Sequence, residues 1–530
     1  MVQIQLYDTT LRDGAQSEGI SFSVVDKLHI ARKLDELGVH YIEGGWPGSN
    51  PKDEEFFTKA RELTLANSAM VAFGSTRHPG GNAETDANLL ALADAGVRVA
   101  TIVGKSSVLQ VKHVLGATLD ENLSMIADSI RFLIGKGLAV FFDAEHFFDG
   151  FKGDPQYSLE VVRVAADAGA RCVVLCDTNG GSLPGEIIAG VEAAKQIASV
   201  PLGIHCHNDG ELAVANSLAA VAAGVTQVQG TINGYGERCG NANLCSIIPA
   251  LKLKMGIDCV TDEQLARLTE VSHYVAELAN LAPDPFLPYV GTSAFSHKAG
   301  FHVSGLGKWE QSYQHIEPAR VGNQPRVVVS ELSGKKNIAH KAREMGLGLP
   351  LSDKETQKLL DQVKLLESRG FQYDSAEASF ELLVYRARPD YVPPFELVDF
   401  MVVVEAKRRP PTGRGVEGAL SEAVVKVRVG TEVMHTAAEG NGPVNALDQA
   451  LRKALLQFYP SLAQVRLVDY KVRILEESIG TGSHVRVLIE SSDGASDWRT
   501  VGSSTNIIEA SWLALADGLE YWLTKHRTSA

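Results

Sequence analysis

The chain has 530 residues, a formal net charge of −14 at pH 7 and 45% hydrophobic residues. It is too long for one ordinary domain, and its apolar content is sufficient for several cores. The negative charge argues against a nucleic-acid-binding protein or a membrane-surface protein. The sequence contains no run of about 18 apolar residues, so we expect no membrane span.

The N-terminus enters a predicted strand at once and lacks the basic and apolar regions of a signal peptide. The six cysteines of so long a chain do not suggest a disulfide framework. We therefore expect a reduced, cytoplasmic protein.

Residues 4 to about 255 repeat one pattern, in which a short apolar strand is followed by a polar turn and an amphipathic helix. The strands lack strict alternation, which indicates parallel strands buried on both faces. Several helices end at a glycine, as helix C-caps do. The predicted strands are 4–8, 41–45, 70–74, 98–103, 139–144, 172–176, 202–205 and 227–231. Eight such units predict an α/β fold of the (β/α)8 TIM barrel type. The alternative is an open doubly wound sheet, but no Gly-x-Gly-x-x-Gly motif follows the first strand.

The pattern changes after the barrel, where prolines and a segment rich in glycine and histidine interrupt the predicted helices 262–279 and 353–368. Residues 386–394 contain three prolines and are typical of a linker. We therefore predict a catalytic barrel over residues 1–275 and a helical linker arm over residues 276–394.

Strands and helices alternate again over residues 395–530, with an internal repeat. Asn445 and Asn506 each begin a predicted helix after a β-rich run, 424–429 in one case and 485–489 in the other. Two similar β-β-α units predict a pseudo-symmetric α+β domain. Such a module can bind a small molecule between its copies, or it can serve dimerisation only, and the pattern leaves both open.

The most informative stretch is the seventh predicted strand, which carries His205 and His207. Side chains alternate along a strand, so both imidazoles lie on one face and can hold a divalent metal. The alternative is one packed core histidine and one loop histidine. A polar turn and a helix follow, which places the pair at the C-terminal end of a barrel strand, where such folds carry their chemistry.

Six of the eight predicted strands end in charged or metal-capable residues. Helix capping could explain any one of them, but together they indicate a polar pocket built around a metal. Asp13, His205 and His207 form a mixed oxygen and nitrogen set, with Asn241 as a possible fourth ligand. Such a set suits Mg, Mn, Co or Zn. Arg12 would be a fixed cation beside the metal, or alternatively a salt bridge at the rim.

An open metal site with an adjacent arginine can chelate a 2-oxo acid through its carboxylate and ketone. It can then stabilise the alkoxide that forms when the ketone is attacked.

Three motifs carry a family resemblance: Leu-Arg-Asp-Gly-Ala-Gln at 11–16, His-Cys-His-Asn-Asp at 205–209 and Gly-Glu-Arg-Cys-Gly-Asn-Ala at 236–242. They resemble the 2-isopropylmalate, homocitrate and citramalate synthases, a family of metal-dependent barrels that condense an acyl-CoA with a 2-oxo acid. The resemblance spans the whole chain. Segments 41–51 and 143–150 are most similar to the long citramalate synthases of this family.

The resemblance implies a role for each matching residue. The implied metal ligands are Asp13, His205, His207 and Asn241, and the implied substrate-pocket residues are Arg12, Glu43 and Thr178. Arg12 matches the residue that polarises the ketone, and Glu145 matches a catalytic glutamate near the acetyl-CoA. The arm resembles the segment that supplies a catalytic histidine and tyrosine, here His302 and Tyr313, which in relatives come from the partner subunit.

The match departs at Ser304, where the isopropylmalate synthases carry an aspartate two residues after the histidine. His302 then needs another group to orient it, and His297 is a competing candidate for the base. The alternative for either histidine is a surface residue without a role.

The resemblance implies an acyltransferase that joins acetyl-CoA, pyruvate and water into (R)-citramalate and CoA, on the pyruvate route to isoleucine. It also implies a divalent metal (Mg, Mn or Zn), a homodimer and an allosteric C-terminal regulatory domain with isoleucine as a possible feedback inhibitor. The first alternative is a 2-isopropylmalate or homocitrate synthase that uses a larger 2-oxo acid. Further alternatives are a hydroxymethylglutaryl-CoA lyase, which carries a Gly-Cys-Pro loop not found here, a metal-dependent hydrolase, and a catalytically dead barrel that serves an amino-acid sensor.

Overall fold

The computed structural model describes residues 4–298, 300–306, 308–327, 341, 352–405, 420–475 and 482–527. It divides into two compact units, each described here by itself. The first comprises Met1–Phe295 and Gln314–Pro325, and the second comprises Ser296–Tyr313 and Arg326–Ala530. The described helices are all too short or too polar to span a membrane.

The first unit is built on a closed barrel of parallel strands that pair in chain order, with β1 beside β8. Its strands are β1 Gln5–Asp8, β2 Tyr41–Gly45, β3 Ala69–Ser75, β4 Val99–Lys105, β5 Ala139–Glu145, β6 Cys172–Asp177, β7 Leu202–Cys206 and β8 Gln227–Gly230. The predicted TIM barrel is therefore confirmed, and the alternative of an open sheet is excluded.

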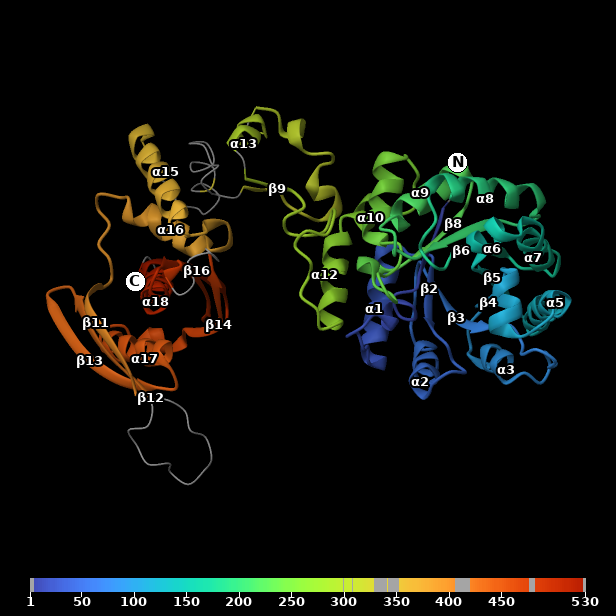
Figure 1. The fold of residues 1–530 in the computed structure, drawn as a ribbon, viewed down its shortest axis with the longest axis horizontal. Helices are drawn as coiled ribbons and strands as arrows, with labels where there is room; N and C mark the ends of the chain where they lie inside the picture. The colour runs from blue at the N-terminus through green and yellow to red at the C-terminus, as the bar shows by residue number, and fades with distance from the viewer. Residues whose placement is uncertain are drawn as a thin grey trace, which may run out of the picture. The chain divides into compact units, whose positions relative to one another are not determined.

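Helices surround the barrel strands (Figure 1). They are α1 Val24–Leu37, α2 Pro51–Ala60, α3 Ala87–Asp94, α4 Val108–Gln110, α5 Leu119–Gly135, α6 Phe147–Gly153, α7 Pro155–Asp167, α8 Pro184–Ile197, α9 Ala213–Ala223, α10 Leu244–Pro249, α11 Asp262–Leu265 and α12 Leu268–Leu278. The predicted helical stretch 262–279 is confirmed, with one interruption between α11 and α12. At the break the Arg267 N–H bonds to the Gln264 carbonyl, three residues back, so the α-helical ladder is interrupted.

Aromatic side chains fill one part of the barrel interior. The rings of Tyr41 and Phe141 lie edge to face with centroids 4.9 Å apart, although β2 and β5 are not neighbours in the sheet. Tyr7 packs within 6.3 Å of both rings. The polar residues that follow the strands lie beyond these rings, at the C-terminal ends of the strands.

The second unit begins with a short parallel pair, β9 Ser296–His297 and β10 Arg326–Val327. Its helices before the repeat are α13 Gly300–Leu306, α15 Asp353–Ser368 and α16 Glu377–Arg386. The predicted helix 353–368 is confirmed as α15, and α16 ends where the predicted linker begins.

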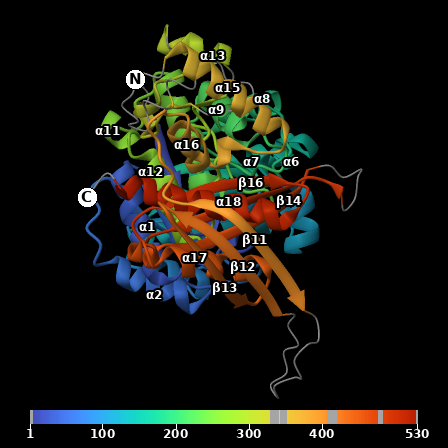
Figure 2. The same cartoon turned by 90° about the vertical axis from the view of Figure 1, so that its left-hand side faces the viewer.

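The C-terminal repeat is confirmed, with one strand more in each copy than the sequence predicted. The first copy is β11 Glu396–Glu405, β12 Leu420–Val429, β13 Glu432–Gly440 and α17 Pro443–Leu455. The second is β14 Arg466–Ile474, β15 Val485–Ser492, β16 Asp497–Ser504 and α18 Ile507–Arg527. Each copy has an antiparallel three-stranded sheet, with α17 on the first and α18 on the second (Figure 2). The first strand of each copy lies at a sheet edge and is largely exposed, although β11 is mostly apolar in sequence.

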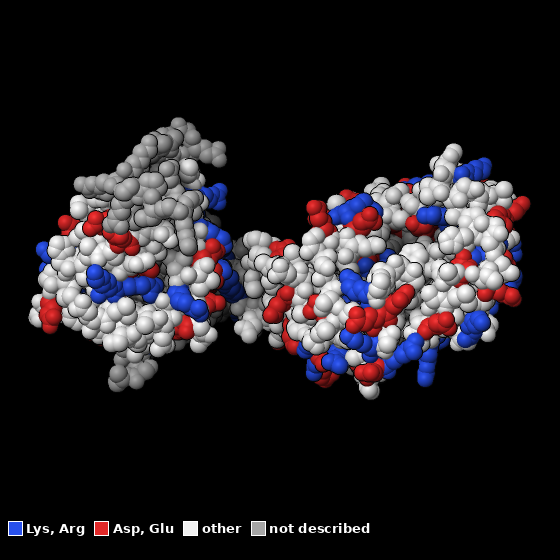
Figure 3. Space-filling model, turned by 90° about the horizontal axis from the view of Figure 1, so that it is seen from below, with Lys and Arg blue, Asp and Glu red and all other residues white. Residues whose placement is uncertain are grey.

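The two copies share details that sequence patterning alone does not reveal. Their first strands have the same irregularity in pairing, between Leu397 and Asp399 in β11 and between Leu467 and Asp469 in β14. The copies also share one core, in which the Phe400 ring stacks on Trp512 with centroids 5.4 Å apart. On the face shown in Figure 3, basic and acidic residues are interspersed over both units.

Candidate metal centre

Three predicted ligands meet at the mouth of the barrel. Asp13 lies in the turn after β1, His205 lies in β7, and His207 follows β7 directly. Their potential ligand atoms lie within 4.8 Å of one another. The Nε2 atoms of His205 and His207 are 3.4 Å apart, and they lie 3.7 and 4.0 Å from Asp13 Oδ2. All three side chains are buried.

The fourth predicted ligand joins them through the backbone. Asn241 pairs with His207 in an isolated antiparallel bridge. Its amide nitrogen donates to the Tyr235 carbonyl at 3.2 Å, which leaves Oδ1 as the available atom. Among the described residues, neither Asn241 Oδ1 nor Asp13 Oδ1 has a hydrogen-bond partner, although both atoms are buried. Two buried oxygens without donors beside two imidazoles fit a divalent cation, which would satisfy all four groups.

The charges of the site favour the protonation states that metal binding requires, namely an ionised carboxylate and neutral imidazoles. Burial alone would raise the pKa of Asp13, but Arg12 and the two histidines outweigh it and lower this pKa to about 2. Burial and the neighbouring His205 lower the pKa of His207 to about 4. Burial also lowers the pKa of His205, although Asp13 acts against it. At neutral pH the site therefore holds one carboxylate and two neutral imidazoles.

Arg12 is fixed on two of its three guanidinium nitrogens. Nε donates to Glu43 at 2.6 Å, Nη1 donates to Asp13 at 3.2 Å, and the guanidinium lies 3.9 Å from the centre of the Phe73 ring. Nη2 has no hydrogen bond to a described residue. Burial lowers the pKa of Arg12, but Glu43 and Asp13 more than compensate and raise it, so the group stays charged beside the metal ligands. One nitrogen of a rigid cation is thus free to contact a substrate.

Glu43, predicted as a substrate-pocket residue, is fully buried in the middle of β2. Its carboxylate accepts hydrogen bonds from Arg12, from the Tyr7 hydroxyl at 2.5 Å and from the Thr9 hydroxyl. The Tyr7 hydroxyl also contacts Thr101 at 2.8 Å. Glu43 therefore holds Arg12 in place, while a direct contact with substrate stays a prediction.

Glu145 and Thr178 lie at the ends of neighbouring strands and are linked through His146. The carboxylate of Glu145 pairs with Lys105. The Thr178 hydroxyl accepts a hydrogen bond from the backbone N–H of His146 at 2.8 Å. His146 has a φ of 58°, a left-handed conformation that is uncommon without glycine and marks a tightly constrained turn at the rim.

The loop after β8 is shaped to present Asn241. A side chain on Gly236 would place its Cβ 2.1 Å from the Asn241 amide nitrogen, so only glycine fits there. Arg238 ties the loop down through two hydrogen bonds to Asp209, at 2.8 and 3.0 Å, and one to the Thr178 carbonyl at 2.7 Å. These contacts give Gly236 and Arg238 a structural role in the same motif as Asn241.

The predicted catalytic residues of the arm lie in the second unit, where they form one cluster. The His302 and Tyr313 rings stack with centroids 4.3 Å apart. The ring of His297, the competing base, lies 6.4 Å from that of His302. His297 Nε2 is buried without a hydrogen-bond partner among the described residues, and burial lowers the pKa of His297. The side chain of Ser304 lies outside the described residues.

Comparisons with known proteins match three successive parts of the chain. The HMGL-like family model matches residues 3–275, a homocitrate synthase post-HMGL domain-like model matches residues 289–370, and the LeuA allosteric (dimerisation) domain matches residues 374–523. An (R)-citramalate synthase of Geobacter sulfurreducens is 52% identical over 99% of this chain and 98% of its own length. The chain belongs to the (R)-citramalate synthase family.

Another member of the citramalate synthase family, from Aquifex aeolicus, is 50% identical over 99% of this chain and 98% of its own length. A 2-isopropylmalate synthase of Methanocaldococcus jannaschii is 31% identical over 99% of this chain and 95% of its own length. Among solved structures, an HMG-CoA lyase of Brucella melitensis covers 53% of this chain and all of its own, with a TM-score of 0.45 and 21% identity. The family assignment makes the protein a condensing acyltransferase with an HMGL-like barrel.

Sequence reasoning missed several residues that support the site in this member of the citramalate synthase family. The Tyr7 and Thr9 hydroxyls donate hydrogen bonds to Glu43, and the Phe73 ring packs against the Arg12 guanidinium. The Gln229 side chain contacts His205. The available signal was a polar residue within a buried strand, as at Gln229 in β8, whose side chain must find a partner inside the barrel.

Proposed function

We propose that the chain is an (R)-citramalate synthase, which condenses acetyl-CoA with pyruvate and water to give (R)-citramalate and CoA. The observation that carries the proposal is the identity of 52% and 50% to two (R)-citramalate synthases along nearly their whole length, against 31% to a 2-isopropylmalate synthase. The buried set of Asp13, His205 and His207 beside Arg12 supports the same chemistry. We assign the barrel, the arm and the regulatory domain to residues 1–275, 276–394 and 395–530.

The site residues divide the reaction between them. Asp13, His205, His207 and Asn241 would hold Mg, Mn or Zn, and the bound cation would supply a Lewis acid for the carboxylate and ketone oxygens of pyruvate. A base removes a proton from the methyl group of acetyl-CoA, and the resulting carbanion forms a carbon–carbon bond with the ketone carbon. The free Nη2 of Arg12 donates to the ketone oxygen as it gains negative charge. Water then cleaves the thioester and releases CoA.

The remaining predicted residues position these groups. Glu43 orients Arg12 through its hydrogen bond to Nε. Thr178 supports the turn that follows Glu145, and Glu145 acts near the acetyl-CoA. These roles rest on the family resemblance and on the contacts at the barrel mouth.

We propose His302 as the base, with Tyr313 stacked against it. Replacing His302 by glutamine should lower kcat by about 10²–10⁴-fold, the usual contribution of a general base, and leave the KM for pyruvate nearly unchanged. Steady-state kinetics on His302→Gln and His297→Gln will decide between the two histidines. A large loss in His297→Gln with near-normal turnover in His302→Gln would transfer the role to His297.

The substrate is tested by CoA release with acetyl-CoA and a divalent metal, with pyruvate, 2-oxoisovalerate and 2-oxoglutarate compared side by side. We expect a strong preference for pyruvate in kcat/KM. A preference for 2-oxoisovalerate or 2-oxoglutarate would make the enzyme an isopropylmalate or homocitrate synthase with the same metal site. No CoA release with any of the three would contradict a condensing enzyme.

We further propose a homodimer that uses the outer face of the first C-terminal sheet, opposite α17. Met401, Val424 and Ala437 stand side by side across β11, β12 and β13 and form an apolar row. Met401 is 56% exposed. Along β12 this row is flanked by Glu422 on one side and Lys426 on the other. A two-fold axis that reverses the strands would place the glutamate of one copy on the lysine of the other, so the occupant we assign is a second copy of this chain.

Met401→Asp should therefore shift the protein from dimer to monomer in light scattering at micromolar concentration, because a buried unpaired carboxylate opposes association. Phe286→Asp, at a 78% exposed position in the first unit, provides the control. A Met401→Asp variant that remains dimeric would exclude this face.

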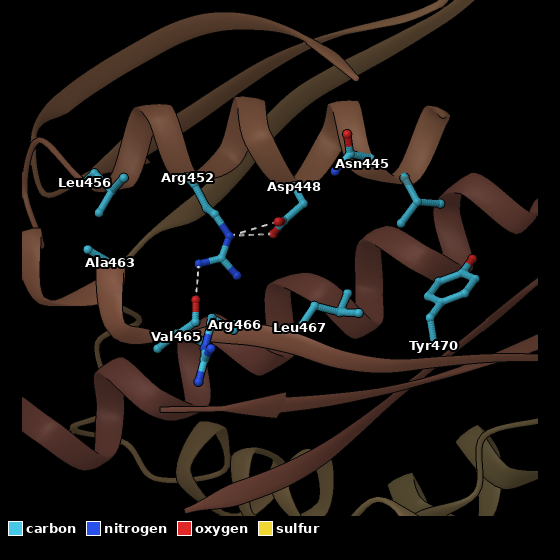
Figure 4. Close-up of a pocket in the computed structure, with 10 residues that line it drawn as sticks. Asn445, Asp448, Arg452, Leu456, Ala463, Val465, Arg466, Leu467 and Tyr470 are labelled. Carbon is cyan, nitrogen blue, oxygen red and sulfur yellow. Dashed lines mark hydrogen bonds and ion pairs between the residues drawn. The ribbon is translucent and has the colours of Figure 1, made fainter. Parts of the chain in front are cut away.

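We assign the feedback amino acid, expected to be isoleucine, to a pocket of about 790 Å³ between α17 and β14 (Figure 4). Asp448 and Arg452 project into it from α17 and form an ion pair at 2.9 Å, and Leu467 lines its other side. A carboxylate and a guanidinium beside apolar walls suit the two charged ends and the side chain of a branched amino acid.

Replacing Asp448 by asparagine should weaken isoleucine binding by at least about tenfold, since a charged hydrogen bond contributes about 1.5–3 kcal/mol. Calorimetric titration with isoleucine and with leucine measures both the affinity and the preference. Tighter binding of leucine would change the effector, whereas unchanged isoleucine binding by Asp448→Asn would exclude the pocket.

A further inference from the structure

We propose that Gln229 is a positioning residue that holds His205 in the metal-binding tautomer, with Asp143 fixing the orientation of the Gln229 amide. The inference rests on the metal site proposed above and concerns residues that do not bind the metal themselves. It explains why two polar side chains lie deep in the barrel, within hydrogen-bonding distance of a ligand and of each other.

The three side chains form a chain of hydrogen bonds. His205 Nδ1 lies 2.9 Å from Gln229 Oε1, and Gln229 Nε2 donates to Asp143 Oδ1 at 3.1 Å. Gln229 is fully buried, and Asp143 and His205 are 4% and 5% exposed. No bulk water therefore competes for these bonds, and each polar atom must be satisfied by its protein neighbour.

The barrel topology brings these residues together from distant parts of the chain. β7 and β8 are neighbours, with Gly203 opposite Gln227 and Ile204 opposite Val228, so His205 stands next to Gln229. β5 is not a neighbour of β8, and Asp143 reaches Gln229 across the interior. The link therefore exists only because the sheet closes.

The direction of the hydrogen bonds determines the tautomer of His205. A carbonyl oxygen can only accept, so Nδ1 must carry the proton when it faces Gln229 Oε1. Nε2 then presents its lone pair, and Nε2 is the atom that lies 3.7 Å from Asp13 Oδ2. With the amide reversed, its N–H would face Nδ1, the proton would move to Nε2, and metal binding would be lost. In the observed orientation Gln229 Nε2 donates to Asp143 Oδ1 at 3.1 Å, and the reversal would break this hydrogen bond.

The two histidines differ in this support. His207 Nδ1 has no hydrogen-bond partner among the described residues. Ligand histidines usually donate their second N–H to an acceptor that fixes the ring, and removing this acceptor costs about 10–100-fold in metal affinity. Gln229 thus supplies to His205 a constraint that the described residues do not give to His207.

The chain offers a matched control two residues away. Gln227 lies in the same strand, is equally buried, and has no hydrogen-bond partner for either side-chain polar atom among the described residues. Methionine has nearly the shape of glutamine but cannot accept the Nδ1–H bond. Gln229→Met and Gln227→Met therefore make the same change in the same strand, with and without the contact to His205.

The test is the dissociation constant for Mn²⁺ alone, measured by electron paramagnetic resonance on the metal-free full-length chain. We expect Gln229→Met to weaken Mn²⁺ binding by about 10–100-fold and Gln227→Met to leave it unchanged. Gln229→Glu, which restores an acceptor for Nδ1, should recover most of the affinity even if Gln229→Met is poorly folded.

Equal Mn²⁺ affinity in Gln229→Met and Gln227→Met would overturn the inference and leave the metal site intact. Failure of Gln229→Glu to recover any affinity would also overturn it, because the effect would then be structural. A wild-type chain that binds no Mn²⁺ would overturn the metal site itself. Loss of condensation with normal Mn²⁺ binding would instead contradict the proposed function.

Discussion

Replacing Arg12 by alanine is expected to lower kcat by about 10²–10³-fold, which corresponds to about 2.7–4 kcal/mol of transition-state stabilisation. Arg12 is held by Glu43 through Nε at 2.6 Å and by Asp13 through Nη1 at 3.2 Å, so its third nitrogen needs no movement to meet the oxygen that becomes negative. CoA release with saturating pyruvate measures the effect.

The same substitution leaves the Glu43 carboxylate buried without its cation, which destabilises the fold as well. Melting temperature and Mn²⁺ binding must therefore be measured on Arg12→Ala, and the comparison of rates is made below the onset of melting. Arg12→Lys keeps the charge but loses the fork of donors, so its kcat should be intermediate. Near-normal turnover in Arg12→Ala with the metal bound would remove Arg12 from the mechanism.

Removing divalent metal with a chelator is expected to abolish turnover, and adding Mn²⁺ or Mg²⁺ is expected to restore it. The physical reason is that Asp13 Oδ1 and Asn241 Oδ1 are buried without hydrogen-bond partners among the described residues. The two histidines face one another, so these groups are arranged for a cation. Metal at about 100 times its dissociation constant should also raise the free energy of unfolding by about 2.7 kcal/mol. Activity and thermal melting, each with and without chelator, measure both effects.

Asp13→Asn separates the metal effect from general damage to the barrel. It removes the only charged ligand of the set, so Mn²⁺ affinity and turnover should fall together. Asp8→Asn is the matched control, because Asp8 is fully buried in the same segment but its carboxylate bonds to Thr10 and not to the proposed ligands. Full activity after exhaustive chelation would contradict a metal enzyme.

Much of the barrel could be predicted because its signal is local. Each unit is a short apolar strand, a polar turn and an amphipathic helix, and the predicted strand 41–45 matches β2. The signal for the histidine pair was also local, because alternation of side chains along β7 alone places His205 and His207 on one face. Asp13 and Asn241 required only the rule that strand ends meet at one rim.

Other features could not be predicted because they depend on which distant side chains meet. The burial of Glu43 under Tyr7, Thr9 and Arg12 requires the register of β1 against β2. The outermost strands of the C-terminal repeat fall outside the predicted β-β-α units, because β11 and β14 are edge strands and neither alternates apolar and polar residues along its whole length. The break between α11 and α12 contains neither proline nor glycine, so the sequence does not predict it.

The sequence by itself determined the barrel, the repeat and the proposed metal ligands, because periodicity and strand-end position are properties of single segments. Only the tertiary structure decided how those ligands are supported. Gln229 reaches His205, and Asp143 reaches Gln229, across a closed barrel. Closure brings strands together that are far apart in the chain, and burial then obliges each polar side chain to bond to whatever neighbour the register provides.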